Sequence, residues 1–366
     1  DPIYNNPYMK ALVLLQSGTV PKVEISDLAV PTPRSGEVLV KVESCGFCYH
    51  DYLVMSGQLR RGVKDHVVLG HEISGTIVDV GENVSSTLVG NRVVSLLTNS
   101  CGVCTRCRQG MEHRCLSGIG IGHGCDGGFA EFVVVSEHSV VVVGESLSFN
   151  QAALLACPIG VVVRGIKEVA KVREGESVVV TGAGGGLGVH AVQVAQALGA
   201  KVLALTSSPD KVAFLETLGA CEVLETGVNR DDNNPIGLRE EVANGIGELV
   251  RFYTKERGAD VVIDTVGTPL FKVSLNSLAQ YGRLLLLGQV SSQMVSFNPA
   301  ELIFLDAQVF GCSGCSRSDV IYANQMIEQG FIEPIICSTL SLEQWYDAFD
   351  SLKRSKAMGR LVFTLG

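Results

Sequence analysis

The sequence changes character near Asn150, and this change constrains the fold more than any single motif. Before it, short β-rich runs such as Glu37–Val42 and Gly75–Val80 are separated by Gly, Pro and Asn turns, a pattern typical of an irregular all-β unit. After it, predicted strands alternate with predicted helices, beginning with Ser177–Thr181, and this alternation indicates a parallel, doubly wound sheet. The late run Arg360–Thr364 again has a strand pattern, and we expect it to return to the first domain. The sequence therefore predicts a protein of mixed α/β and β class with two domains.

Four cysteines are closely spaced within the β-rich part of the chain. Cys101, Cys104, Cys107 and Cys115 have the spacing CxxCxxCx7C. Two short steps bring three sulfur atoms together and a longer loop returns the fourth, which suits a tetrahedron with Zn–S distances near ~2.3 Å. Such a closed site has no open position for a substrate. The pattern predicts a structural zinc lobe.

A glycine-rich turn follows the strand Ser177–Thr181 and leads into a predicted helix. Glycines let the backbone approach a pyrophosphate closely, and the helix N-terminus offers free N–H groups. We expect a dinucleotide to bind here, while the alternative is an ordinary tight turn between a strand and a helix. The residues expected to contact the cofactor are Gly182, Gly185, Gly186, Leu187 and Gly188.

The next predicted strand ends in Thr206, Ser207 and Ser208. At this point an NAD-binding protein often has a carboxylate for the ribose 2′-hydroxyl, and these three positions have none that would repel a 2′-phosphate. Lys211 follows closely. Small hydroxyls with a lysine favour NADP(H) over NAD(H), although no arginine accompanies them. The alternative is that Lys211 is a solvated helix residue.

Composition limits the compartment and the classes of partner. A net charge of -9 and a pI near 5.3 provide no basic surface for nucleic acid or an anionic membrane. No apolar stretch approaches the roughly 20 residues of a membrane span. Twelve cysteines in a long chain without a recognisable signal peptide favour metal binding and reduced thiols, so we expect a cytoplasmic protein. The polar stretch Thr226–Pro235 is interpreted as a surface insertion.

A second candidate metal site is dispersed along the chain at Cys48, His71 and Cys157. Two thiolates, one imidazole and an open fourth position would form a catalytic zinc site. Ordinary interpretations stay open, because an isolated cysteine is more often a small buried hydrophobe and a lone histidine is often structural. Asp51 supports the metal hypothesis, since a carboxylate can hold the other ring nitrogen of a metal-bound histidine.

Five segments of the chain carry a family resemblance. They are Cys45-Gly-Phe-Cys-Tyr-His-Asp51, Gly70-His-Glu-Ile-Ser-Gly75, the four-cysteine lobe, Gly182–Gly188 and Val262-Ile-Asp-Thr-Val-Gly267. In this order they resemble the zinc-containing medium-chain alcohol dehydrogenases, over nearly the whole chain from Met9. The resemblance implies a GroES-like catalytic domain over residues 9–159 and 301–366. It implies a Rossmann cofactor domain over residues 160–300, with the active site between the two.

The resemblance also implies roles for individual residues. Cys48, His71 and Cys157 match the catalytic zinc ligands, with Glu72 and Asp51 as neighbouring carboxylates. The structural zinc ligands are matched by Cys101, Cys104, Cys107 and Cys115, which gives two zinc ions per chain. The family positions that line the nicotinamide pocket correspond to Val266, Gly267, Leu287 and Gly288. Arg317 corresponds to the arginine that contacts the cofactor pyrophosphate.

The chain departs from the family pattern along the usual proton route. The family often has Arg or His, then Ser or Thr, after the first ligand, but here Tyr49 and His50 follow it, and the relay histidine is replaced by Leu53. His50 either replaces the hydroxyl as a direct acid or base, or is an ordinary contact beside the metal or cofactor. The Cys-Tyr-basic-Asp order is also similar to the acryloyl-CoA reductase branch, which reduces a carbon–carbon double bond with NADPH.

We therefore predict a zinc-dependent, NAD(P)-dependent alcohol dehydrogenase or carbonyl reductase that acts on a small molecule. One alternative is an NADPH-dependent enoyl-thioester reductase. Another is a catalytically silent binding protein that keeps the fold and the structural zinc. The resemblance further implies a homo-oligomer, either a dimer or a tetramer.

Overall fold

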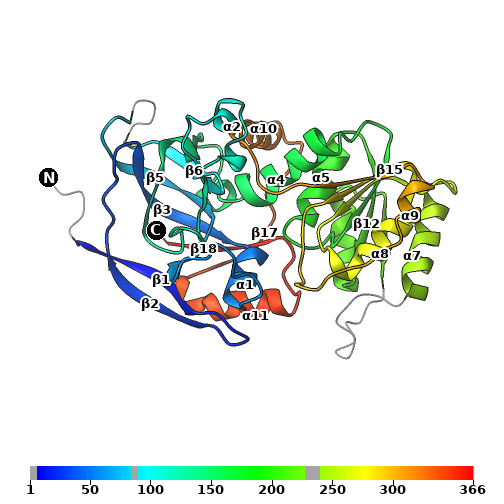
Figure 1. Ribbon diagram of the computed structural model, residues 1–366, viewed down its shortest axis with the longest axis horizontal. Coiled ribbons are helices and arrows are strands. Elements are labelled where there is room, and N and C mark those ends of the chain that lie inside the picture. Colours follow the sequence, from blue (N-terminus) through cyan, green and yellow to red (C-terminus); the bar gives the residue numbers. More distant parts are fainter. Residues whose placement is uncertain (1–5, 85–88, 227–239, 366) are drawn as a thin grey trace. The chain divides into compact units, whose positions relative to one another are not determined.

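The computed structural model describes residues 6–84, 89–226 and 240–365. These residues form two compact units, which Figure 1 shows in ribbon form. Unit 1 comprises residues up to Gly160 together with Gly314–Glu328 and Pro334–Gly366. Unit 2 comprises Val161–Ser313 and Gln329–Glu333. Each unit has its own hydrophobic core.

Unit 1 is built mainly from β-strands. They are β1 (Tyr8–Gln16), β2 (Lys22–Ala29), β3 (Glu37–Phe47), β4 (Val67–Val68), β5 (Glu72–Val80), β6 (Arg92–Ser95), β7 (Thr98–Asn99), β8 (Ile119–Gly120), β9 (Phe132–Ser136), β10 (Val140–Val142), β17 (Ile336–Leu340) and β18 (Arg360–Thr364). The main sheet has the order β10-β6-β5-β3-β18-β17, with β9 also paired to β3. Two smaller sheets have the orders β2-β1-β4 and β7-β8.

The helical elements of unit 1 are mostly short. They are α1 (Tyr49–Met55), α2 (Thr105–Arg108), η1 (Glu112–Arg114), η2 (Glu137–Ser139), α3 (Phe149–Ala152), η3 (Leu155–Gly160), α10 (Arg317–Glu328), η7 (Leu342–Gln344) and α11 (Trp345–Lys353). The π-helical turn η3 contains Pro158, which has no N–H to donate to the preceding turn. A π-helical turn of this kind often marks a functional position, and here it carries Cys157.

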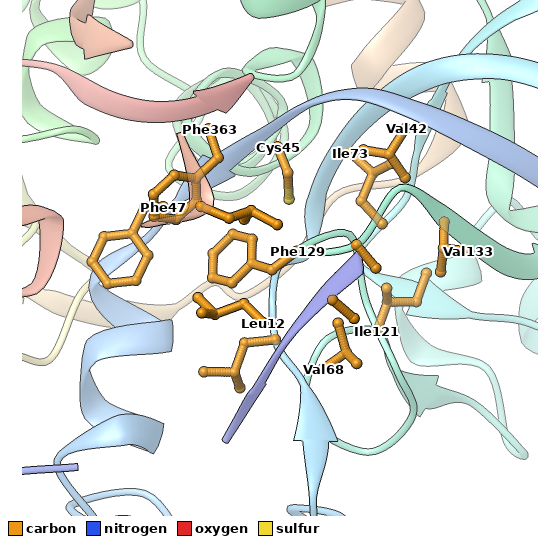
Figure 2. Packing of buried hydrophobic residues seen from close by; sticks show 14 of the residues in the cluster. Leu12, Val42, Cys45, Phe47, Val68, Ile73, Ile121, Phe129, Val133 and Phe363 are labelled. Carbon is orange, nitrogen blue, oxygen red and sulfur yellow. The ribbon is translucent and has the colours of Figure 1, made fainter. Parts of the chain in front are cut away.

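An aromatic cluster packs in the core of unit 1, as Figure 2 shows. Phe47 ends β3, Phe363 lies in β18, and Phe129 precedes β9; their ring centroids are 4.9, 5.7 and 5.8 Å apart. All three side chains are fully buried. Aromatic contacts at such distances contribute roughly 0.5–1.5 kcal/mol each beyond the burial of area. The cluster anchors the end of β3, directly before Cys48.

Unit 2 contains a six-stranded sheet whose paired strands are all parallel. The strands are β11 (Ser177–Thr181), β12 (Lys201–Thr206), β13 (Glu222–Glu225), β14 (Ala259–Asp264), β15 (Leu278–Leu286) and β16 (Gln308–Gly311). The helical elements are α4 (Val161–Val163), η4 (Arg164–Val169), α5 (Gly188–Ala197), η5 (Pro209–Lys211), α6 (Val212–Thr217), α7 (Glu240–Tyr253), η6 (Thr268–Leu270), α8 (Phe271–Asn276) and α9 (Ala300–Ile303). The strand order β13-β12-β11-β14-β15-β16 reverses between β11 and β14, and doubly wound sheets bind ligands at this switch point.

The predicted combination of an irregular β unit with a parallel, doubly wound sheet is confirmed. The run Arg360–Thr364 returns to unit 1, where it pairs with both β3 and β17. Residues 301–313, which we expected in the first domain, lie in unit 2 because β16 is hydrogen-bonded to β15. Residues 227–235 of the predicted surface insertion lie outside the described residues.

Candidate metal centres and cofactor site

Antiparallel pairing of β3 with β5 brings two of the dispersed candidate ligands together. The register places Gly46 opposite Glu72, so Cys48 and His71 lie just beyond the end of this ladder. Cys48 is the N-cap of α1, and Asp51 completes a capping box with it, because the Asp51 carboxylate accepts the Cys48 N–H at 2.9 Å. The strand ends therefore fix both side chains, although 22 residues lie between them in the sequence.

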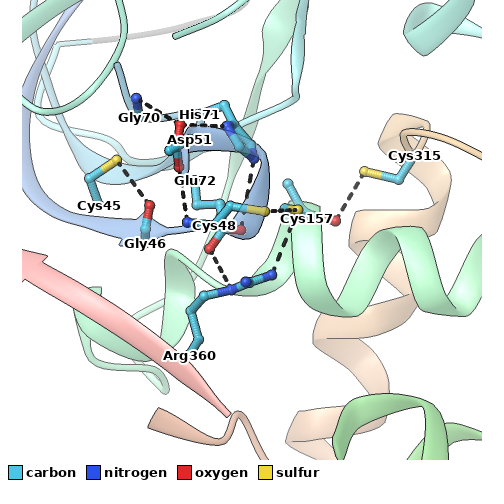
Figure 3. Close-up of polar contacts among 11 residues, drawn as sticks. Cys45, Gly46, Cys48, Asp51, Gly70, His71, Glu72, Cys157, Cys315 and Arg360 are labelled. Atoms are coloured by element: carbon cyan, nitrogen blue, oxygen red, sulfur yellow. Dashed lines mark hydrogen bonds and ion pairs between the residues drawn. The ribbon is translucent and has the colours of Figure 1, made fainter. Parts of the chain in front are cut away.

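The four side chains of this candidate metal group face one another, as Figure 3 shows. The donor atoms of Cys48, His71, Glu72 and Cys157 all lie within 4.8 Å of one another, and all four residues are buried. The two sulfur atoms are 3.8 Å apart. The Nε2 atom of His71 lies 3.9 Å from Glu72 Oε1. Two sulfurs and one imidazole, with an oxygen nearby, form the type of donor set that catalytic zinc sites use.

Asp51 contacts His71 on the ring nitrogen that faces away from the other candidate ligands. Its Oδ1 lies 3.3 Å from Nδ1 of His71 and accepts the backbone N–H of Gly70 at 3.4 Å. The Asp51 side chain is fully buried. A carboxylate in this position keeps the proton on Nδ1 and leaves Nε2 as the donor atom for a metal.

A buried ion pair joins the group to the last strand of the chain. The Nε atom of Arg360, in β18, lies 3.1 Å from Glu72 Oε2, and its Nη2 lies 3.9 Å from the Cys157 sulfur. Both charged side chains are almost completely buried. The sequence analysis did not identify Arg360 as a site residue. The only sign of it in the sequence was a charged residue at the start of an otherwise largely apolar strand, Arg-Leu-Val-Phe-Thr.

The ionisable groups of this site strongly perturb one another. The hydrogen bond with Cys157 lowers the pKa of Cys48 well below its usual value and raises the pKa of Cys157. Burial raises the pKa of Glu72 to about 7, against the opposing effect of Arg360. Burial disfavours a charged His71, but Asp51 and Cys48 outweigh it and raise the pKa of His71 well above its usual value. Metal binding to such a group would release protons, because the ligating forms are thiolate and neutral imidazole.

The four-cysteine lobe also brings its sulfur atoms together. The Cys115 sulfur lies 3.5 Å from that of Cys101 and 3.9 Å from that of Cys104, and the Cys107 sulfur belongs to the same group. A zinc tetrahedron with Zn–S near ~2.3 Å has sulfur atoms about 3.8 Å apart, so the spacing fits. Backbone N–H groups of Val103 and Cys104 lower the pKa of Cys101 to about 6. Burial raises the pKa of Cys107 to about 12.

His50 lies beside the candidate catalytic group together with a histidine that sequence reasoning did not find. Its ring centroid is 5.3 Å from that of His71 and 4.8 Å from that of His123. Burial lowers the pKa of His50, and burial also lowers that of His123 to about 4. Within the described part of the chain, His50 Nε2 and His123 Nδ1 are buried without a hydrogen-bond partner. The signal in the sequence was the short Gly-His-Gly segment, which is too common to indicate a site.

In unit 2 the predicted glycine-rich turn joins β11 to α5. Gly182 has φ +60°, and a Cβ on Gly188 would overlap the Gly182 carbonyl, so the turn requires glycine at both positions. Gly185, Gly186 and Leu187 complete the turn before α5 begins. This arrangement leaves the N-terminus of α5 free of side-chain capping, as a pyrophosphate site requires.

The predicted cofactor-specificity residues adjoin this turn. Lys211 is buried, and a Cβ on Gly184 would collide with its side chain, so the lysine stem packs over the glycine-rich turn. Thr206 ends β12, and its hydroxyl accepts the N–H of Ser208 at 3.1 Å. Ser207, between them, is exposed.

The residues expected around the nicotinamide lie at neighbouring strand ends. Val266 and Gly267 follow β14, while Leu287 and Gly288 follow β15, which is paired with β14 in parallel. The two segments are hydrogen-bonded, since the Val290 N–H donates to the Val266 carbonyl at 3.0 Å.

Arg317, expected at the cofactor pyrophosphate, belongs to unit 1. Its guanidinium donates to the His138 carbonyl at 3.1 Å, and its backbone N–H donates to Glu112 at 3.4 Å. Within unit 1 it therefore packs beside the four-cysteine lobe.

Two further properties concern the cysteines and the helices of the chain. All twelve cysteines are free of disulfide bonds. Among the described residues, no helix combines the length and apolar character needed to cross a lipid bilayer.

Comparison with known proteins gives consistent matches along the chain. Residues 34–145 match the alcohol dehydrogenase GroES-like domain, and residues 186–329 match the zinc-binding dehydrogenase family. Over 357 residues the chain is 36% identical to acryloyl-coenzyme A reductase of Metallosphaera sedula, covering 97% of this chain and 100% of that protein. It is 30% identical over 363 residues to an NAD-dependent alcohol dehydrogenase of Sulfurisphaera tokodaii, covering 97% and 99% of the two chains. The crystal structure of AibC matches with a TM-score of 0.85 at 33% identity, covering 100% of this chain and 98% of that one.

These matches confirm the family resemblance inferred from the motifs. Unit 1 has the GroES-like fold, and unit 2 has the Rossmann-type fold that binds NAD(P). The protein is an oxidoreductase of the zinc type, with a Cys/His group suited to the metal. The chain belongs to the zinc-containing medium-chain dehydrogenase/reductase, or alcohol dehydrogenase, family.

Proposed function

We propose that this protein transfers a hydride between a nicotinamide cofactor and the carbon of an alcohol, aldehyde or ketone, with a zinc ion held by Cys48, His71 and Cys157. The observation that carries the proposal is the buried cluster of two sulfurs and one imidazole, with Glu72 beside it. Three protein ligands leave a fourth position for the substrate oxygen. When bound, zinc in such a site supplies Lewis-acid polarisation of that oxygen.

The chain's own residues then prepare the site. Asp51 orients His71 through Nδ1, and Arg360 offsets part of the negative charge that two thiolates and Glu72 would otherwise concentrate in a buried space. The four residues of the donor group are buried, and a buried site limits the access of water during hydride transfer.

We assign proton exchange with the substrate oxygen to His50. Its ring lies beside His71, and its Nε2 is buried without a hydrogen-bond partner among the described residues. Its pKa is lowered by burial, so at neutral pH the imidazole is mostly uncharged and able to accept a proton from an alcohol. The usual family residues for this proton transfer are absent here, because the relay histidine is replaced by Leu53 and the usual hydroxyl by His50 itself. His50 would therefore take over the proton transfer.

A second candidate reaction is the NADPH-dependent reduction of an enoyl thioester. It is supported by the two relatives named acryloyl-coenzyme A reductase, at 36% and 34% identity, and by the Tyr49-His50 pair after the first ligand. In this reaction hydride adds to the β-carbon and a proton adds to the α-carbon. The third prediction, a silent binding protein, has less support because all three candidate ligands are present in one buried group.

A spectrophotometric screen tests these reactions directly. Purified protein of measured zinc content is assayed at 340 nm with aldehydes, ketones, alcohols and crotonyl or acrylyl thioesters, each with NAD(H) and NADP(H). Turnover of carbonyls or alcohols supports the main proposal. Oxidation of NADPH by the thioesters alone favours the second candidate. A lack of turnover with every substrate, in protein that contains one zinc per chain, would revive the binding protein.

We further propose a preference for NADP(H) and a content of two zinc ions per chain. The first is supported by Ser207, Ser208 and the packing of Lys211 over the glycine-rich turn. The second is supported by the two separate donor groups. The ratio of kcat/KM for NADPH and NADH, and zinc analysis of the purified protein, check these points. A cytoplasmic location is supported by the twelve cysteines, none of which forms a disulfide bond, because such thiols suit a reducing compartment.

We also propose that the protein is a homo-oligomer. β16 is the terminal strand of the parallel sheet, and an open strand edge is a ready surface for pairing with a second copy. Large apolar side chains in the segment that precedes β16 are exposed, including Ile303 at 67% and Phe304 at 79%. Exposed groups of this kind often mark an interface.

A further inference from the structure

Asp264, the last residue of β14, has a fully buried carboxylate without a cationic partner among the described residues. Neutral donors surround it instead. Its Oδ1 accepts the backbone N–H groups of Val266 and Gly267 at 2.9 and 2.8 Å and the Thr181 hydroxyl at 2.9 Å. Its Oδ2 accepts the Ser274 hydroxyl at 2.7 Å. One side chain therefore fixes the segment that follows its own strand.

The backbone of the same residue holds a second segment. The Asp264 carbonyl accepts the N–H groups of Leu287 and Gly288 at 2.8 and 3.2 Å. Gly288 approaches so closely that a Cβ there would overlap the Thr265 carbonyl. Asp264 is thus hydrogen-bonded to both segments that are expected to line the nicotinamide pocket.

The glycine-rich turn adjoins this network as well. Thr181 pairs with Asp264 across the parallel strands β11 and β14 and directly precedes Gly182. The Thr265 hydroxyl donates to the Thr181 carbonyl at 2.7 Å. The carboxyl ends of β11, β14 and β15 therefore meet at Asp264, on the side of the sheet where a doubly wound fold binds its ligand.

A buried carboxylate is costly unless hydrogen bonds satisfy it, and an apolar side chain often stabilises a core equally well. What an apolar residue cannot do here is accept the four side-chain hydrogen bonds, which connect residues 266–267 to Thr181 in β11 and to Ser274 in α8. The two bonds from Leu287 and Gly288 go to the backbone carbonyl, so the same residue also holds the second segment. We propose that Asp264 is a positioning residue: its carboxylate fixes residues 266–267 relative to residues 287–288, which its backbone carbonyl holds, and this spacing orients the nicotinamide half of the cofactor. This inference rests on the proposed use of NAD(P)(H).

The test compares a complete cofactor with a fragment that lacks nicotinamide. Binding of NADPH and of 2′-phospho-ADP-ribose, with NADH and ADP-ribose in parallel, is measured by calorimetry for the parent and for Asp264→Ala. We expect Asp264→Ala to weaken the binding of NADPH about tenfold or more, because the Val266 and Gly267 N–H groups lose their acceptor, while binding of the fragment changes less than about twofold. In Asp264→Asn the side-chain oxygen can still accept from Val266 and Gly267, and the affinity for NADPH should stay within about threefold of the parent.

Ser274→Ala is the matched control. It removes only the hydrogen bond that the Ser274 hydroxyl donates to the Asp264 carboxylate, and Ser274 lies in α8, outside the glycine-rich turn and both loop segments. It should leave both affinities within about twofold of the parent. If Asp264→Ala does not fold, Asp264→Ser carries the same comparison, since a hydroxyl and a water can occupy part of the carboxylate's place. Parallel loss of both ligands, or no loss of either, would overturn the role of Asp264 and leave the proposed function standing. A parent protein that binds none of the four ligands would overturn the proposed function, and this inference with it.

Discussion

Gly46 controls how closely β3 approaches the candidate catalytic group. It lies opposite Glu72 in the β3–β5 ladder, and a Cβ built on it would overlap the Glu72 carboxylate and lie 2.9 Å from the Glu72 Cβ. Glu72 cannot retreat without giving up its ion pair with Arg360. The absence of a side chain at Gly46 is therefore a condition for the buried Glu72–Arg360 pair.

We predict that Gly46→Ala lowers the free energy of unfolding by roughly 1–3 kcal/mol and reduces bound zinc, because the added methyl group overpacks the site. Gly144→Ala is the control, since a Cβ there meets no atom within 4 Å, and its effect should stay within about 0.5 kcal/mol. Urea unfolding and zinc analysis of the two variants measure the difference. Equal effects of the two substitutions would contradict the packing argument.

The histidine pair His50–His123 makes stability depend on pH. Burial, and then the nearby His50 and His71, lower the pKa of His123 to about 4, while Asp51 acts in the opposite direction. An unfolded histidine titrates near ~6.5, so between these values the unfolded state binds more protons. The stability that His123 contributes is therefore complete above about pH 6.5 and is lost as the pH falls toward about 4.

We predict that His123→Gln loses less stability than the parent between pH 7 and pH 5. The difference should be roughly 1–2 kcal/mol at most, because this partly exposed ring is screened by solvent. Urea unfolding at the two pH values measures it, with His66→Gln as a control at an exposed position. A parent and a His123→Gln variant with the same pH dependence would show that the histidine contacts have no energetic weight.

At the level of elements, the four-cysteine lobe and the metal group around Cys48 are separate structures within unit 1. The lobe is formed by β7, α2, η1 and β8, and it also contacts the start of α10, where the Arg317 N–H donates to Glu112. The other group is formed by the ends of β3 and β5 together with η3 and β18. Loss of one metal should therefore leave the other bound.

We predict that Cys48→Ala and Cys115→Ala each reduce bound zinc from two ions to one per chain. Cys48→Ala should abolish turnover, by at least about 10³-fold, while cofactor binding persists. Cys115→Ala should lower the thermal midpoint strongly, because a structural zinc contributes to folding energy, but any folded fraction should retain turnover. Zinc analysis, calorimetry and the assay distinguish the two. Full activity in Cys48→Ala would refute the zinc mechanism.

The elements also explain which features the sequence could predict. Strands Ser177–Thr181 and Lys201–Thr206 occur at the predicted residues, because buried parallel strands read as apolar runs with clear turns after them. Strand Arg360–Thr364 was also predicted at its residues, since it is a short, buried, largely apolar run that follows Gly359. Strand β16 was not predicted, since its four residues have no distinctive pattern and lie partly exposed at the sheet edge. A short edge strand forms because it is hydrogen-bonded to a neighbouring strand, and the local sequence of the short strand does not show that neighbour.

The candidate site was predictable only where spacing or family pattern marked it. The four cysteines are close in sequence, so their spacing alone indicated a metal group. Arg360 and His123 were missed because their contacts with Glu72 and His50 join residues 288 and 73 positions apart, and no local pattern records such pairs. Asp264 belongs to one of the segments that carry the family resemblance, but the sequence did not indicate a role for it. The proposed role depends on hydrogen-bond donors at the ends of three different strands.

At the level of the whole molecule, the open edge at β16 predicts self-association. We predict that the parent is at least a dimer in solution and that Phe304→Glu shifts it toward the monomer, because a charge replaces a side chain that is 79% exposed in the single chain. Light scattering after size exclusion measures the mass. Tyr8→Glu, at an exposed aromatic of unit 1, is the control. A monomeric parent would contradict the proposal.

The placement of the ligands at strand ends also determines where this chain can vary in length. Cys48 and His71 are fixed by the β3–β5 ladder, so a one-residue insertion within either strand would turn a ligand away from the group. The exposed residues 60–62 and 64–66 lie between them in the connecting segment, outside the ladder. Insertions or deletions there would leave the metal group intact. The length of this segment is therefore independent of the ligand geometry, whereas the lengths of β3 and β5 are not.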